Sequence, residues 1–190
     1  MSTDFAAARL NMVESQIRTA DVTDLPLQDA LRVVAREALV PASKAYLAYA
    51  DAEVEYAPGR WLLKPRDVGK LLQFLKPRAG EKALAIAAPY AAAVLETMGL
   101  SVTRLEGDDL KSPAGDGYDV IICEGAVLAA PAAWTEVLAV GGRLGVVERS
   151  GPVGQATVHV RAEDGVGRRA VFDATPPILA GFSAEPGFAF

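Results

Sequence analysis

An α/β fold with a mostly parallel sheet is the architecture that this sequence predicts, and three observations support it. From Pro65 to Glu148, short apolar segments rich in β-branched residues alternate with segments of helical periodicity. This alternation is typical of a parallel sheet with helices on both faces. Before Pro65 the periodicity is helical. After Glu148, two strand-like segments flank Glu163-Asp164-Gly165, a turn signal that predicts an antiparallel hairpin at the edge.

The segment before Pro65 is expected to form a helical cap. Asp4 and Asp24 are suitable N-caps, because a short acidic side chain accepts a hydrogen bond from the first turn of a helix. The expected elements are helices from Asp4 to Ile17 and from Asp24 to Leu39, a short helix at 46–49, a weak strand at 53–56 and a loop at 58–61. We therefore divide the chain into a cap and loop, residues 1–64, and a sheet, residues 65–190, which together make one compact unit.

The α/β part also predicts where a site should lie. Its expected elements are helices at 65–75, 91–98 and 131–140 and strands at 83–87, 101–105, 118–123, 143–148, 157–161 and 168–172, with Gly141-Gly142 capping the third helix. In parallel sheets the binding crevice lies beyond the carboxyl ends of the strands, where the strand order reverses. We therefore expect any site to follow Ala87, Leu105 and Cys123.

Composition narrows the classes of function. The chain has 190 residues, 51% of them hydrophobic, with one cysteine and one histidine. These counts exclude an intramolecular disulfide and the usual zinc clusters, so we expect no metal. A catalytic triad would need His159, which has no acid or nucleophile near it in the sequence.

Charge and hydropathy exclude two classes of binding partner. The net charge is -5, and the absence of a basic stripe predicts no nucleic-acid partner. No apolar run approaches the roughly 18 residues that span a bilayer, and the N-terminus lacks the pattern of a signal peptide. We therefore expect a cytoplasmic protein that does not bind membranes.

Six segments carry a resemblance to a known family. They are Met12–Arg18, Val34–Pro41, Ala48–Asp51, Leu84–Ile86, Tyr118–Ile122 and Gly141–Leu144. In their sequences and in their order along the chain, these segments resemble protein-L-isoaspartate O-methyltransferases over almost the whole chain. The resemblance implies a three-layer, Rossmann-like class I methyltransferase sheet. It also implies S-adenosylmethionine as the cofactor and, as substrate, the stray carboxylate of isoaspartyl residues in damaged proteins.

The glycine-rich cofactor loop that the resemblance implies is altered. In the family's frame its acidic position is Ala85, and its glycine positions are Ala87, Pro89 and Ala91. A Cβ disfavours positive φ and stands where backbone should touch the ligand, and Pro89 has no amide donor. Losing three or four polar contacts of about 1 kcal/mol each weakens binding by roughly a few hundredfold. We therefore expect S-adenosylmethionine to bind weakly or not at all.

The loop between Gly59 and Pro65, which has the family's length, is altered too. The family places Thr, Ser and Gln there, and the Ser helps to hold the acceptor carboxylate. The matching positions here are Trp61, Leu63 and Lys64. Methyl transfer depends mainly on positioning, so this change removes much of the catalysis. We interpret Trp61 and Leu63 as a plug of the old acceptor site, with a partner-binding patch and ordinary loop packing as the alternatives.

The chain is also shorter than the resemblance implies. About a dozen residues separate Leu105 from Tyr118, too few for the helix and strand that the family has there, so one β-α unit is expected to be missing. Glu106 matches the acid that holds the cofactor ribose or, with Asp108, a later motif near the adenine. We favour the first, because an edge unit is easier to delete. If a cofactor binds, Glu106, Asp108 and Glu124 are the polar groups expected near it.

Two neighbouring residues and the tail complete the candidates. Cys123 ends an apolar strand and is expected to pack rather than react. Glu124 follows it at the crevice, where a functional carboxylate, a helix cap and a solvated side chain are all open, and the last two are favoured. The tail is expected to dock on a partner or on the sheet through Pro176, Pro177, Phe182, Phe188 and Phe190.

Three hypotheses follow. The favoured one is a pseudoenzyme: a member of the family without ordinary cofactor and acceptor chemistry, which has a binding or regulatory role toward a protein partner. The second is an active S-adenosylmethionine-dependent carboxyl methyltransferase with a remodelled site that acts on damaged proteins. The third is a homodimeric assembly module, paired through the exposed strand Ser101–Leu105.

Overall fold

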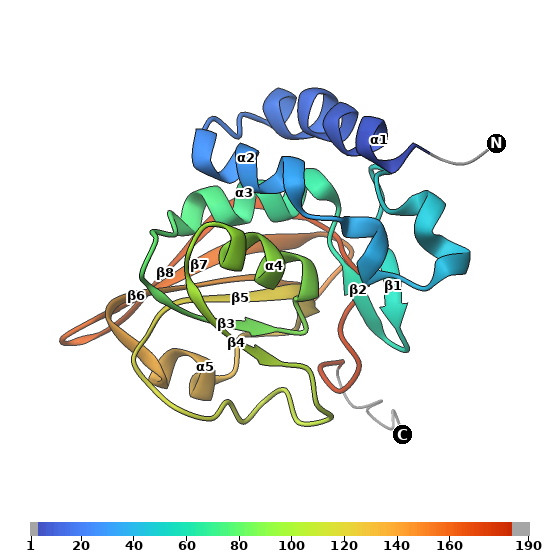
Figure 1. Ribbon diagram of the computed structural model, residues 1–190. Coiled ribbons are helices and arrows are strands. Elements are labelled where there is room, and N and C mark those ends of the chain that lie inside the picture. Colours follow the sequence, from blue (N-terminus) through green and yellow to red (C-terminus); the bar gives the residue numbers. More distant parts are fainter. Residues whose placement is uncertain (1–3, 184–190) are drawn as a thin grey trace, which may run out of the picture.

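The computed structural model describes residues 4–183 and has a six-stranded sheet at its centre (Figure 1). The strand order is β4-β3-β5-β6-β7-β8. The bounds are Lys82–Ile86 (β3), Ser101–Leu105 (β4), Tyr118–Val127 (β5), Leu138–Glu148 (β6), Gly154–Ala162 (β7) and Gly165–Ala174 (β8). β3 to β6 run parallel to one another, and β7 and β8 form an antiparallel hairpin at one edge. The predicted fold class is confirmed.

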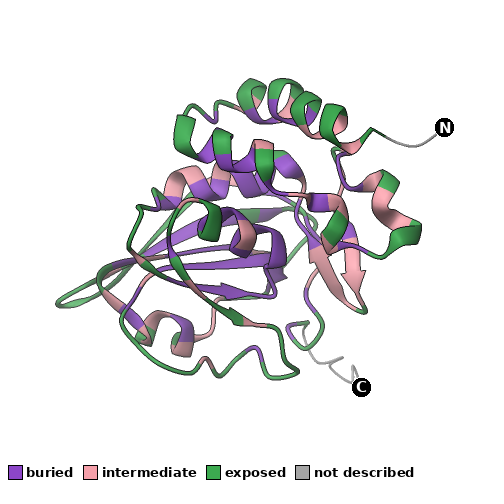
Figure 2. Cartoon of the chain, viewed as in Figure 1, coloured by how far each residue is buried: buried purple, intermediate pink, exposed green. Residues whose placement is uncertain are grey.

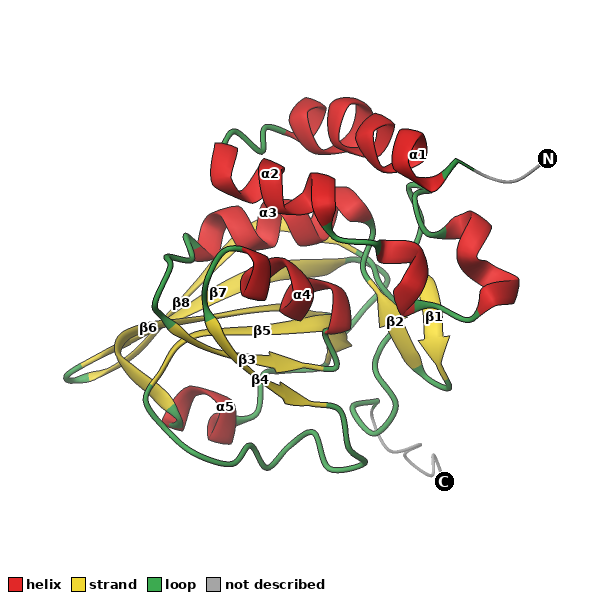
Figure 3. Ribbon diagram, in the orientation of Figure 1, coloured by secondary structure: helices red, strands yellow, loops and turns green. Residues whose placement is uncertain are grey.

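Helices cover the two faces of the sheet unequally (Figure 3). α3 (Pro65–Leu75) and α4 (Pro89–Thr97) pack on one face, and the short α5 (Ala132–Glu136) packs on the other. α1 (Phe5–Met12) and α2 (Leu25–Val33) lie over α3 and α4 as the predicted cap. Figure 2 shows that the strands between these layers are buried, whereas the edge strand β4 is largely exposed. No helix within residues 4–183 has the length and apolar character needed to cross a membrane.

The cap is less regular than its periodicity predicts. Both expected N-caps are confirmed: the Asp4 carboxylate accepts from the Ala7 N–H at 3.0 Å, and the Asp24 carboxylate from the Leu27 N–H at 2.9 Å. The remaining elements are a π-helical turn at Val13–Ile17, 3-10 turns at Arg18–Ala20, Arg36–Leu39 and Ala42–Leu47, and a two-stranded sheet of β1 (Val54–Ala57) and β2 (Arg60–Leu62). The loop expected at 58–61 is therefore largely the turn and second strand of a hairpin.

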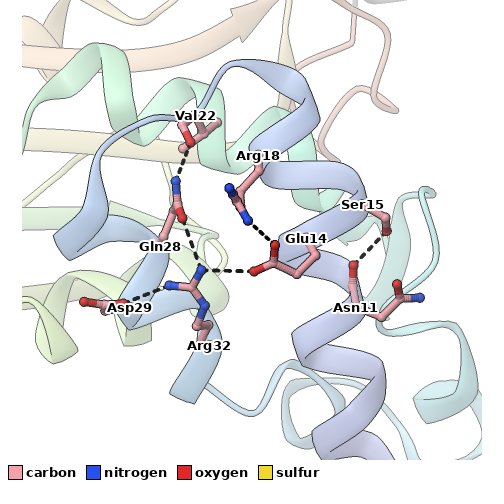
Figure 4. Close-up of polar contacts among 8 residues, drawn as sticks. All are labelled: Asn11, Glu14, Ser15, Arg18, Val22, Gln28, Asp29 and Arg32. Carbon is pink, nitrogen blue, oxygen red and sulfur yellow. Dashed lines mark hydrogen bonds and ion pairs between the residues drawn. The ribbon is translucent and has the colours of Figure 1, made fainter.

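A polar cluster fastens the π-helical turn to α2 (Figure 4). The Glu14 carboxylate accepts from Arg18 and, at 3.2 Å, from Nη2 of Arg32. The same Arg32 nitrogen donates to Gln28 Oε1, and Gln28 in turn donates to the Val22 carbonyl at 2.8 Å. These bonds hold α2 against the π-helical turn and the segment that follows it.

The prediction around Gly141-Gly142 was wrong. The helix expected at 131–140 is only α5, Ala132–Glu136, and the glycine pair lies inside β6 instead of capping a helix. β6 changes register against β5 at this point. A Cβ added at Gly142 would lie 2.6 Å from the carbonyl oxygen of Tyr118. The glycines therefore serve a β-bulge, which a helix-capping pattern imitates.

Candidate functional site

The predicted crevice lies at the carboxyl ends of β3, β4 and β5. β3 ends at Ile86, and the turn into α4 begins at Ala87, whose φ is +45°. The Ala87 N–H donates to the carbonyl of Leu105 at 2.9 Å. Ala85, Ala87 and Pro89 are buried. The turn thus keeps a left-handed backbone of the kind that glycine favours, although its residue is alanine.

Glu124 lies at the centre of this crevice and is completely buried. Its Oε1 accepts a hydrogen bond from the Ala91 N–H, in the first turn of α4, at 2.7 Å. Its Oε2 accepts from the Leu63 N–H at 3.0 Å. The amino end of a helix is a ready site for an anion, and here the chain's own carboxylate occupies it.

Arg36 is the buried cation of the site, and sequence reasoning did not single it out. Its Nε donates to the carbonyl of Ala48 at 2.6 Å, and its Nη2 donates to the carbonyl of Leu63. The guanidinium lies over the ring of Tyr90, 4.6 Å from the centroid. Arg36 Nη1 and the Tyr90 hydroxyl are buried without a hydrogen-bond partner among the described residues. The one signal available was its place within the family-like segment Val34–Pro41.

Burial dominates the electrostatics of Glu124. Removal from water raises the pKa of this carboxyl to about 7, although the charge of Arg36 and the two amide donors lower it. Burial also raises the pKa of the neighbouring Cys123 thiol, which lies fully inside the sheet. A buried thiol with a raised pKa is a poor nucleophile, in agreement with the predicted packing role.

Of the three residues predicted to replace the acceptor groups, Leu63 contacts Glu124. Leu63 is completely buried, and its peptide links Glu124 to Arg36. Trp61 is partly exposed within β2. Lys64 is partly buried, with its Nζ 3.9 Å from the Glu53 carboxylate. Leu63 is therefore part of the buried interior, whereas Trp61 and Lys64 are only partly buried.

The acids after β4 lie outside the buried part of the crevice. Glu106 is exposed and accepts from the Tyr56 hydroxyl at 3.0 Å. Asp108 is exposed on the connection 106–117, which has no helix or strand. Nη2 of Arg60 donates to the carbonyl of Gly107 at 2.9 Å. Glu106 and Asp108 thus do not share an open pocket with the buried Glu124.

Residues 175–182, which we name the strap, run across the same edge of the sheet. The Ala126 N–H donates to the Pro177 carbonyl at 3.0 Å, and the Leu179 N–H donates to the Ala126 carbonyl at 2.8 Å. Leu179 is completely buried, and the Phe182 ring lies 5.5 Å from that of Trp134. Of the two outcomes left open for the tail, its described part docks on the sheet. Phe188 and Phe190 lie outside the described residues.

His159 has an acidic partner that the sequence did not reveal. Its Nε2 lies 3.3 Å from Oε1 of Glu148, at the end of the neighbouring strand, and 3.4 Å from Oγ1 of Thr157. Because the carboxylate and the hydroxyl share one ring nitrogen, this histidine does not relay a proton between them as in a triad. The cluster therefore ties β6 to β7.

Two cavities of the described residues lie elsewhere. One of about 400 Å³ lies between the π-helical turn and α3, and one of about 580 Å³ lies beside Glu148. Ala87, Glu106 and Glu124 line neither of them. Within residues 4–183, no group of three or more His, Cys, Asp or Glu side chains is placed to hold a metal ion.

Comparison with known proteins decides the family. The chain is 34% identical over 181 residues to a protein-L-isoaspartate O-methyltransferase of Methylorubrum populi, covering 81% of this chain and 85% of the relative. The chain belongs to the protein-L-isoaspartate O-methyltransferase family. A second relative, protein-L-isoaspartate O-methyltransferase 1 of Rhodopseudomonas palustris strain HaA2, is 32% identical over 171 residues, which are 75% of this chain and 70% of that protein. No protein-family model matches the chain.

Solved structures of the same name share the fold. One protein-L-isoaspartate O-methyltransferase superposes with a TM-score of 0.72 at 17% identity, over 91% of this chain and 66% of that one. A beta-aspartate methyltransferase from Plasmodium falciparum, crystallised with S-adenosyl-L-homocysteine, has a TM-score of 0.74 at 12% identity, over 94% of this chain and 99% of that one. At these identities the likeness establishes the fold alone.

Proposed function

We propose that this chain is a non-catalytic, cytoplasmic member of its family that acts by binding, as a regulator of a protein partner. The observation that carries the proposal is the position of Glu124, whose carboxylate accepts hydrogen bonds from the amides of Leu63 and Ala91 inside the crevice. A ligand that needs the amino end of α4 must first displace this side chain. Since the carboxylate is fully buried, its displacement also opens the hairpin above it.

The altered family positions support the same proposal. The turn after β3 commits its Ala87 N–H to Leu105, and Pro89 supplies no amide donor. At the acceptor position, the buried Leu63 side chain replaces a hydroxyl. S-adenosylmethionine therefore loses both polar contacts and space, and an isoaspartyl carboxylate loses the group that holds it.

Titration calorimetry with S-adenosyl-L-homocysteine tests this proposal. We expect no heat of binding at millimolar ligand from a sample that unfolds cooperatively, and no methylation of an isoaspartyl peptide. Micromolar binding, or robust methylation by the pure chain, would refute it. Glu124→Thr in the full chain is the variant to titrate in parallel, because it removes the carboxylate from the amino end of α4 and keeps a small polar group.

An active carboxyl methyltransferase with a remodelled site is the second candidate. The left-handed backbone at Ala87 favours it, because the turn keeps the course that a cofactor loop needs. In this case Glu106 and Asp108 carry cofactor contacts, and damaged proteins with isoaspartyl residues are the substrate. Glu106→Ala and Asp108→Ala then lower kcat/KM in a methylation assay, and unchanged activity would refute the assignment of these residues.

Assembly into a homodimer is the third candidate, favoured by one feature of the sheet. β4 pairs with β3 on one side and lies at the edge of the sheet, with most of its residues exposed. An unpaired edge strand favours pairing with a second copy. Light scattering at high protein concentration tests this role: a monomer would refute it.

A further inference from the structure

β3 pairs with only part of β5, and the strap lies beside the part of β5 that β3 does not reach. β3 pairs with β5 only as far as Cys123, whereas β5 continues to Val127. Along a strand, successive residues hydrogen-bond to opposite neighbours. The Val127 carbonyl accepts from Arg149, on the β6 side, so Ala126 faces the side of β3. There it exchanges two backbone hydrogen bonds with Pro177 and Leu179 in a parallel bridge.

The groove beside β5 is shaped for one apolar side chain. Leu179 lies against Gly125, where an added Cβ would be 2.6 Å from its Cδ2. Gly125 has φ of +120°, a conformation that only glycine adopts without strain. Leu179 packs in the apolar cluster on the α5 face of the sheet, together with Ala87, Cys123 and other buried residues. A leucine-sized pocket and a strip of main-chain donors and acceptors are the two parts of a strand-addition site.

The strap also contacts the turn of the hairpin formed by β1 and β2. The Ala180 N–H donates to the Gly59 carbonyl at 3.3 Å, and a Cβ at Gly59 would lie 2.7 Å from that of Ala180. Two residues of β5 that are two positions apart hold the two parts: Glu124 binds the amide of Leu63, directly after the hairpin, and Ala126 binds the strap. Movement of one part therefore disturbs the other.

We propose that the free side of β5 beyond Cys123 is a strand-binding groove for an extended peptide, which the strap fills in cis. The ligand class is a peptide in β conformation with a leucine-like residue at the Leu179 position. A tethered strap has an effective concentration in the millimolar range, so the filled groove excludes peptides that bind more weakly. This role goes beyond the loss of catalysis and does not depend on it.

A full-length Leu179→Asp variant tests the groove, with Thr175→Ala as the control at an exposed strap position. We expect Leu179→Asp to release the strap, so that hydrogen exchange quickens at the amides of Ala126, Leu63 and Ala91, while Thr175→Ala leaves it unchanged. A synthetic peptide with the sequence of residues 175–182 should restore protection at Ala126. It should bind the variant at least about tenfold more tightly than the unchanged chain, whose groove is filled.

Two results would overturn the proposal. One is faster exchange confined to residues 175–182, because the strap would then cover nothing. The other is the absence of saturable peptide binding by a variant that still melts cooperatively; a scrambled peptide that binds equally well counts in the same way. If Leu179→Asp does not fold, Leu179→Ala removes the anchor without adding a charge. Binding of S-adenosyl-L-homocysteine by the unchanged chain would refute the proposed function but would leave the peptide result standing.

Discussion

Two carboxylates lie near the carboxyl ends of the parallel strands β5 and β6, one buried and one partly buried, and their pKa values move in opposite directions. Glu124, on β5, has its pKa raised to about 7 by burial. Glu148 ends the neighbouring β6, and its pKa is lowered to about 2. Burial opposes that lowering, but hydrogen bonds from His159, the Ala130 N–H and Arg168 outweigh it.

The difference shows how partners decide the state of a buried acid. Glu148 has the Arg168 guanidinium and the His159 ring within hydrogen-bonding range, whereas Glu124 has two neutral amides and a guanidinium that acts at longer range. A charge-assisted bond is roughly twice as strong as a neutral one. The antiparallel half of the sheet thus keeps its acid ionised, and the crevice holds an acid that changes charge near neutral pH.

The largest expected effect comes from removing the cation of the crevice. Arg36→Met leaves the carbonyls of Ala48 and Leu63 without their buried donor and Glu124 without a counter-charge. We expect a loss of about 3–5 kcal/mol in the free energy of unfolding and a further rise in the pKa of Glu124. Denaturant unfolding measures the first quantity. Arg32→Met is the control: this partly exposed arginine should cost less than about 1 kcal/mol, and an equal cost would contradict the buried role of Arg36.

Glu148→Gln removes the carboxyl group whose pKa is lowered. A carboxyl with a folded pKa below its unfolded value stabilises the protein above the unfolded pKa, and this contribution is lost as the pH falls through the folded pKa. For a shift from 4.5 to about 2, the substitution should cost about 3 kcal/mol at pH 7. It should also flatten the decline of stability between about pH 4.5 and pH 2. Glu163→Gln, in the exposed hairpin turn, should change neither quantity.

Glu124→Gln removes the carboxyl group whose pKa is raised, for which the pH dependence of stability has the opposite sign. Because the folded pKa of Glu124 is raised from 4.5 to about 7, the folded state holds its proton more firmly, and stability falls as the pH rises through this range. We expect the unchanged chain to lose about 2 kcal/mol from this residue between about pH 5 and pH 7.5. The glutamine variant should lack that decline. Identical pH profiles of the two chains would show that Glu124 is ionised throughout.

The smallest expected effect concerns the turn after β3. Ala87 has φ of +45°, where a Cβ is strained. Ala87→Gly should therefore stabilise the protein by about 1 kcal/mol. Ala88→Gly is the matched control, because Ala88 has φ of -133° and gains nothing from the change. A thermal melt that places both variants below the unchanged chain would rule out strain at Ala87.

The sequence predicted which strands and which helix surround the candidate site, but not which residues meet there. Period-2 and helical patterns located β3, α4, β4 and the start of β5, and the rule for parallel sheets placed a site after Cys123, where Glu124 lies. Its partners could not be found in this way, because Leu63 and Arg36 come from distant parts of the chain. Arg36 also interrupts no pattern, since a buried arginine has the sequence appearance of an exposed one.

Two further misses have physical causes. The length of β5 was underestimated, because Glu124 and Gly125 look like the end of a strand when their burial under the hairpin and strap is unknown. The acid partner of His159 was missed, because side chains that meet across two strands have no fixed separation in sequence. Glu148 is paired with Gln155 and His159 with Leu144, so their side chains meet diagonally across β6 and β7. Both misses concern contacts that require tertiary pairing.

The strap has a consequence for the order of folding. It follows β8 in the chain, and its partners Gly59 and Ala126 belong to much earlier elements. Contacts between residues far apart in sequence cost loop-closure entropy, and they offset this cost only after the intervening strands have formed. We therefore expect the hairpin and strap to close last during folding and to open first under mild denaturant, as a local unit of low stability. The crevice then becomes accessible through partial unfolding while the sheet remains intact.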